Sequence, residues 1–270
     1  MVLEEDDLLG AMHRGKGASD AVLFIHGAYL SSACWYDWRR SYEVQGYPCE
    51  APGWPYYDES VWDIRRRPAK GIDQLSISCI VNYYERIIRQ FRTPPILIGH
   101  SFGGLFVQIL LGRGLGKAGI AISPIPVRDA GSLRANMLAL VGVRGWNRAF
   151  QMSFQKFSSS LAQTLSPTEQ HALYEEYVVP TPARIHYEAV LGIGTKIRFR
   201  NSNRAPLLLV AGEKDMIVPP SVVRALRNRY GTSVHTTDLM VFPDRPHLMI
   251  LSRGWQEIAA ACLEWIKERS

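Results

Sequence analysis

The pattern G-x-S-x-G at residues 99–103 constrains this chain more than any other stretch, because it suits a sharp turn between a strand and a helix. Residues 96–98 form a short apolar run bounded by prolines and a glycine, which indicates a strand buried on both faces. From residue 102 to residue 112 apolar side chains recur at helical spacing. Ser101 therefore lies at the corner, where small neighbours let its hydroxyl stand clear of the sheet.

This corner has the geometry of a nucleophile. The backbone N–H of Phe102 follows Ser101 at the start of the helix, where an oxyanion can be stabilised. A serine hydroxyl is a poor nucleophile near neutral pH, so it needs a base, and the base needs a group that orients it. Asp215 and His247 each follow a predicted strand, at the edge of the sheet that Ser101 occupies. We predict that these three residues are catalytic.

The strand-turn-helix context and the order Ser101, Asp215, His247 resemble the α/β-hydrolase family. The resemblance extends from the turn at residues 26–27 to the C-terminal helix. It implies an α/β fold that has a mostly parallel sheet, helices on both faces and a helical lid insertion. Some relatives take the acid from the loop after the preceding strand, where Asp129 is the alternative to Asp215.

The resemblance also implies a second oxyanion donor. In hydrolases of this kind the residue after a His-Gly pair supplies that N–H, and here this residue is Ala28. Two convergent backbone donors would then share the charge of a tetrahedral intermediate. His100 lies inside the central motif but points across the turn, so we expect it to support the site without reacting.

The order of predicted elements indicates one α/β domain with an insertion. Strands are predicted at residues 21–25, 47–51, 96–98, 119–123, 207–211 and 239–242. Residues 127–202 show no clear strand and much helical spacing, including residues 133–141. We therefore assign residues 1–126 and 203–270 to the hydrolase core and residues 127–202 to the lid.

Aromatic residues of two regions are candidates for substrate contact. Trp146 and Phe150 are spaced with Phe154 and Phe157 as if on one helical face of the lid. Such a face must bury itself, against either the pocket or neighbouring lid helices. Tyr29 and Trp54 lie in loops at the carboxyl edge of the sheet, where ligands bind in open α/β folds.

The expected reaction is hydrolysis of carboxylic esters through an acyl-enzyme, with small or aryl esters as the small-molecule substrates. It needs no cofactor, and no metal-binding motif is visible in the sequence. Two alternatives stay open, because a fold alone does not decide function. One is a C–C hydrolase or lyase reaction on the same three residues, and the other is a ligand receptor without catalysis.

Composition bears on the partners. The net charge of +6 comes from scattered basic residues, and no nucleic-acid motif accompanies them, so no nucleic-acid partner is expected. The four cysteines show no metal spacing and are expected to be free and mostly buried. The N-terminus is acidic, and no window approaches the roughly 20 apolar residues of a membrane span. We expect a cytoplasmic protein that does not bind membranes; the sequence leaves its oligomeric state open.

Overall fold

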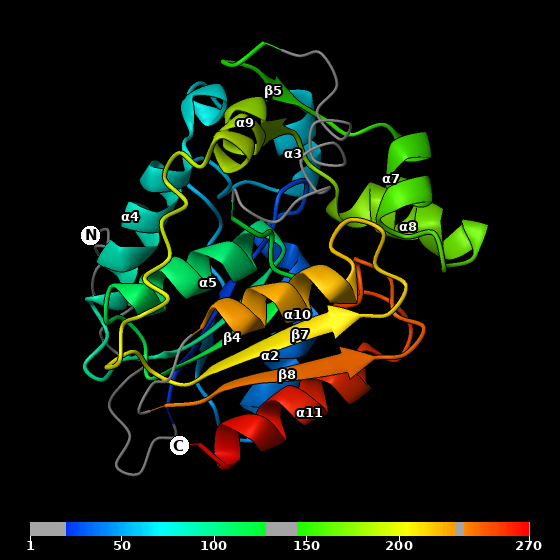
Figure 1. The fold of residues 1–270 in the computed structure, drawn as a ribbon. Coiled ribbons are helices and arrows are strands. Elements are labelled where there is room, and N and C mark those ends of the chain that lie inside the picture. The colour runs from blue at the N-terminus through cyan, green and yellow to red at the C-terminus, as the bar shows by residue number, and fades with distance from the viewer. Residues whose placement is uncertain (1–19, 128–144, 231–234, 270) are drawn as a thin grey trace, which may run out of the picture.

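Figure 1 shows the computed structural model, which describes residues 20–127, 145–230 and 235–269. At its centre is a six-stranded sheet with the strand order β2-β1-β3-β4-β7-β8, in which every neighbouring pair is parallel. The strands are β1 (Val22–Ile25), β2 (Cys49–Glu50), β3 (Ile96–His100), β4 (Ala118–Ile122), β7 (Leu207–Gly212) and β8 (Thr237–Phe242). Each lies where the sequence predicts a strand, so the expected parallel α/β sheet is confirmed.

Helices cover both faces of this sheet. One face carries α4 (Ile77–Ile88), α5 (Phe102–Gly112) and α10 (Pro220–Arg229), and the other carries α2 (Tyr36–Glu43) and α11 (Trp255–Lys267) (Figure 1). The chain moves along the sheet in one direction from β1 to β2 and in the opposite direction from β3 to β8. Because the crossovers are right-handed, α2 lies on one face of the sheet, and α5 and α10 lie on the other. Strands β1, β3, β4 and β7 are buried throughout and form the core.

Three short helical elements lie in the loops between β1 and α4: η1 (Ser32–Trp35), α3 (Val61–Arg66) and η2 (Ile72–Gln74). All four cysteines are free, with Cys79 exposed and the other three buried. No helix within the described ranges is long and apolar enough to cross a membrane.

The segment between β4 and β7 is only partly helical. Its described part contains β5 (Ala149–Phe150), α7 (Phe154–Ser160), α8 (Pro167–Tyr177), β6 (Thr181–Pro182) and α9 (Ala183–Leu191). Strands β5 and β6 pair in antiparallel orientation, which the sequence did not predict. The prediction that Trp146, Phe150, Phe154 and Phe157 share one helical face was wrong. Trp146 lies in a turn, Phe150 in β5, and Phe154 and Phe157 in α7. The helical spacing at residues 133–141 lies outside the described residues.

Backbone contacts attach this segment to the loops at the carboxyl edge of the sheet. In Figure 1, α7 and α8 lie beyond the arrowheads of β7 and β8. The N–H of Leu248 donates to the carbonyl of Leu161 at 3.1 Å. Leu30 and Val178 form an antiparallel bridge. The segment therefore forms a wall beside the strand ends where the sequence predicts the site.

Candidate active site

The turn at Ser101 has the backbone that its sequence indicates. Strand β3 ends at His100 and helix α5 begins at Phe102, and Ser101 between them has a φ of 56° and a ψ of −116°. A Cβ on Gly103 would lie 2.0 Å from the carbonyl oxygen of Ile25, so only glycine allows helix and strand to approach this closely. This contact leaves the serine hydroxyl at the start of the helix, above the end of the sheet.

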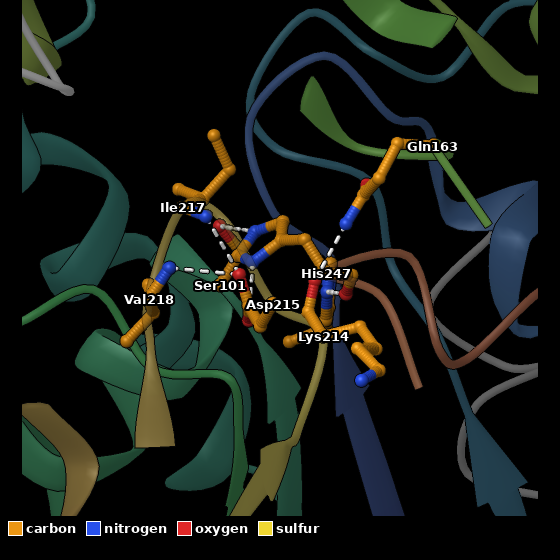
Figure 2. Close-up of polar contacts among 8 residues, drawn as sticks. Ser101, Gln163, Lys214, Asp215, Ile217, Val218 and His247 are labelled. Carbon is orange, nitrogen blue, oxygen red and sulfur yellow. Dashed lines mark hydrogen bonds and ion pairs between the residues drawn. The ribbon is translucent and has the colours of Figure 1, made fainter. Parts of the chain in front are cut away.

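Ser101, His247 and Asp215 form one chain of hydrogen bonds, shown in Figure 2. The Nε2 atom of His247 lies 3.1 Å from the Oγ of Ser101, and its Nδ1 lies 2.9 Å from Asp215 Oδ2. The other carboxylate oxygen of Asp215 accepts the N–H groups of Ile217 and Val218 at 2.8 and 2.7 Å. These two bonds fix the carboxylate, so the predicted triad residues meet in hydrogen-bonding order.

His100 fixes the loop that carries His247. Its ring is buried, and burial lowers its pKa from 6.5 to about 3, so the imidazole is neutral. A neutral ring that carries its proton on Nε2 donates to the backbone carbonyl of His247 at 2.8 Å. His100 thus holds the backbone of His247, which agrees with its expected supporting role.

The two predicted oxyanion donors border the same pocket as Ser101. Ala28 and Phe102 both line it. Neither backbone N–H has an acceptor within the described part of the chain. Buried N–H groups normally have partners, so two unused donors beside a serine hydroxyl are suited to a ligand oxygen.

The pocket over Ser101 is mostly apolar. Its lining residues are Ala28, Tyr29, Leu30, His100, Ser101, Phe102, Ile125, Leu161, His186, Ile217, His247 and Leu248. Leu161 and His186 come from the segment between β4 and β7, so that segment closes one side of the pocket. The sequence analysis missed His186, because a single histidine on an amphipathic helix carries no signal of a site.

The structure brings only one of the four predicted substrate contacts to this pocket. Tyr29 lines it. Phe150 packs behind Tyr29, with ring centroids 5.7 Å apart. Trp54 is fully buried and stacks on His26 at 4.8 Å, beneath the His-Gly turn. Trp146 is 37% exposed and stacks on Tyr187.

Trp54 therefore supports the turn and does not line the pocket. Its backbone N–H donates to Nε2 of His26 at 3.1 Å. Burial lowers the pKa of His26 to about 4, so this nitrogen can accept a bond. The alternative acid Asp129 lies outside the described residues, and the carboxylate that contacts His247 is Asp215.

Comparison with known proteins places these features in a family. A model of the alpha/beta hydrolase family matches residues 22–261. No curated protein matches this chain in sequence.

Many solved structures share the fold. A monoacylglycerol lipase from Paleococcus ferrophilus is 20% identical, with a TM-score of 0.67 over 92% of this chain and 94% of that chain. A methylesterase from Arabidopsis is 16% identical, with a TM-score of 0.68 over 92% and 99% of the two chains. A thermophilic esterase from Thermogutta terrifontis is 15% identical, with a TM-score of 0.69 over 94% and 92%. At such identities the likeness establishes the fold alone.

Proposed function

This chain belongs to the alpha/beta hydrolase family, and on that premise we propose that it hydrolyses carboxylic esters through an acyl-enzyme on Ser101. The observation that carries the proposal is the hydrogen-bond chain from Ser101 through His247 to Asp215 at the floor of an apolar pocket. The solved structures that share its fold include a lipase, a methylesterase and an esterase, whose names all denote ester cleavage.

In the first half of the reaction Ser101 Oγ attacks the ester carbonyl carbon. His247 Nε2, which lies 3.1 Å from that oxygen, takes its proton. The imidazolium that forms keeps its Nδ1–H on Asp215, whose charge stabilises it. The backbone N–H groups of Ala28 and Phe102 receive the negative charge that develops on the carbonyl oxygen.

Collapse of this intermediate releases the alcohol, which takes the proton from His247. The acyl group stays on Ser101 as an ester. A water molecule then attacks the acyl carbon and gives a proton to His247. The bond between that carbon and Ser101 Oγ breaks, His247 returns the proton to Oγ, and the carboxylic acid leaves. Every proton in this cycle moves through His247, so the proposed reaction needs no metal and no cofactor.

The shape of the pocket favours small or aryl esters. Aliphatic side chains and the ring of Phe102 line it, while Leu161 and His186 close it from the side of the inserted segment. Apolar walls accommodate short acyl groups and aromatic rings. A long flexible chain would have to displace this wall.

A panel of p-nitrophenyl esters tests the proposal. Wild-type protein is assayed from acetate to long-chain acyl groups beside Ser101→Ala, which removes the nucleophile and leaves the packing of helix and sheet intact. We expect Ser101→Ala to lose at least about 10³-fold in turnover. A fluorophosphonate should label wild type at Ser101. Equal turnover by the variant, or labelling at another residue, would refute the assignment.

A further inference from the structure

The residue after Ala28 has an unusual backbone. Tyr29 has a φ of +67° although it is not glycine. A bulky side chain rarely adopts this left-handed conformation, because its Cβ crowds the following carbonyl. Such a conformation persists only when its surroundings hold it in place. The neighbours of Tyr29 must therefore stabilise the turn that presents the N–H of Ala28.

The inserted segment holds Tyr29 at both ends. The N–H of Val179 donates to the carbonyl of Tyr29 at 2.9 Å. At the far end of the side chain, the phenolic oxygen lies 2.9 Å from Nε2 of His186 on helix α9. Both partners are buried. A backbone bond and a side-chain bond thus fix the same residue from one neighbouring segment.

His186 also contacts the residue that carries the other predicted donor. Its ring packs edge-on against Phe102, with centroids 5.1 Å apart. The same imidazole therefore touches Phe102 and the residue that follows Ala28. Both oxyanion donors are joined through one side chain that takes no part in the proton transfers.

The bond between Tyr29 and His186 persists over the working pH range. Burial lowers the pKa of His186 to about 4, so its ring is neutral near pH 7. A phenol and a neutral imidazole share one hydrogen whichever ring nitrogen carries the proton. The contact needs no charge and is little affected by salt.

We propose that Tyr29 and His186 are positioning residues: their bond holds the turn after β1 so that the N–H of Ala28 faces the oxyanion, and His186 holds Phe102 beside it. This inference rests on the proposed function, because it assumes that Ala28 and Phe102 stabilise an oxyanion. The inserted segment then contributes to the rate of the chemical step, through His186 and Val179, without touching the reacting atoms.

Four variants test this inference. Tyr29→Phe and His186→Leu each remove the bond, whereas His186→Gln keeps a polar group at the position of Nε2 and can still bond to the phenol. Tyr42→Phe is the matched control: it removes another buried tyrosine hydroxyl, which donates to the carbonyl of Ala259 at 3.1 Å and lies outside both the pocket lining and the inserted segment.

The readouts are kcat and KM for a p-nitrophenyl ester and the inhibition constant of an aryl trifluoromethyl ketone, which forms a tetrahedral adduct on the serine. Loss of an oriented oxyanion donor lowers kcat, so we expect about a 10- to 100-fold decrease in Tyr29→Phe and His186→Leu. KM should change little, and the ketone should bind more weakly by a similar factor, as a transition-state analogue does. His186→Gln should recover most of the activity, and Tyr42→Phe should keep its kcat even if its melting temperature falls.

The outcomes separate this inference from the proposed function. If wild type cleaves esters and both bond-breaking variants keep their kcat, the positioning role is wrong. If only KM rises, and only for substrates that carry a polar substituent, the pair recognises substrate and the positioning role is again wrong. If wild type cleaves no ester and the ketone does not bind, the proposed function fails and the inference fails with it.

Discussion

Replacement of Gly103 by alanine tests how strictly the approach of α5 to β1 controls the site. The added Cβ would lie 2.0 Å from the carbonyl oxygen of Ile25 and 2.9 Å from that of His26, whereas real Cβ contacts essentially never fall below 3.0 Å. Both oxygens belong to the backbone and cannot rotate away. The start of α5 and the end of β1 must therefore separate by about 1 Å, since a close-packed interior has no other space.

This displacement moves both sides of the proposed site. Phe102 begins α5 and Ser101 directly precedes it, while Ala28 follows the end of β1 by three residues. A misplacement of about 1 Å can cost about 10²-fold in rate, which we take as the expected fall in kcat/KM. Overpacking usually destabilises by about 1 to 3 kcal/mol, and a clash with fixed backbone atoms belongs at the upper end, near 3 kcal/mol.

The assays are urea unfolding followed by circular dichroism and kcat/KM for a p-nitrophenyl ester. Gly145→Ala is the control, because among the described residues a Cβ there meets nothing closer than the Cγ of Arg148 at 3.5 Å. Its stability should stay within about 0.5 kcal/mol of wild type. If Gly103→Ala matches this control in both assays, the helix and strand are not as close as described and the reasoning is refuted.

Three further predictions follow from the site and its surroundings. Asp215→Asn should keep the fold and lower turnover by up to about 10⁴-fold, because an amide that still accepts the N–H groups of Ile217 and Val218 turns its NH₂ toward His247. If Asp129→Asn lowered turnover more than Asp215→Asn does, the catalytic acid would instead follow β4. Burial lowers the pKa of His26 and His186 from 6.5 to about 4 and that of His100 to about 3, so the unfolded chain binds protons that the fold excludes. The free energy of unfolding should therefore be highest above pH 6.5. It should fall by up to about 1.4 kcal/mol per pH unit for each histidine as the pH drops toward 4. A urea midpoint that is the same at pH 6.5 and pH 4 would contradict this expectation. Trp146→Ala should leave relative rates across acyl chain lengths unchanged, because Trp146 stacks on Tyr187 away from the pocket, and a shift in preferred length would show otherwise.

Local sequence patterns predicted the turn at Ser101 and the two residues that form a chain of hydrogen bonds with it. The glycines around Ser101 and the change from strand to helical spacing indicate the turn because no other backbone suits them. Asp215 and His247 could be chosen because parallel strands end at one edge of the sheet, so residues that follow different strands meet there. The hydrogen bonds among the three residues in the structure agree with that choice.

Residues whose positions depend on packing between distant segments could not be predicted. The spacing from Trp146 to Phe157 imitates a helical face, but β5 pairs with β6 there, and a two-residue strand leaves no periodic signal. Trp54 lies in a loop at the correct edge, yet it is fully buried and stacks on His26 beneath the turn, a contact between two loops that no local pattern encodes. His186 meets Tyr29 across 157 positions of the chain, a contact that no local pattern encodes.

The long separations within the site have a consequence for how the chain folds. His186 joins Tyr29 across 157 positions, and His247 joins Ser101 across 146. Closing loops of that length costs entropy before the contacts can stabilise anything, so such contacts form late and folding is slow. The helices and central strands can form while the turn after β1 still lacks the segment that holds it. During refolding, ester hydrolysis should therefore recover after the circular dichroism signal, once residues 178–186 have docked on that turn.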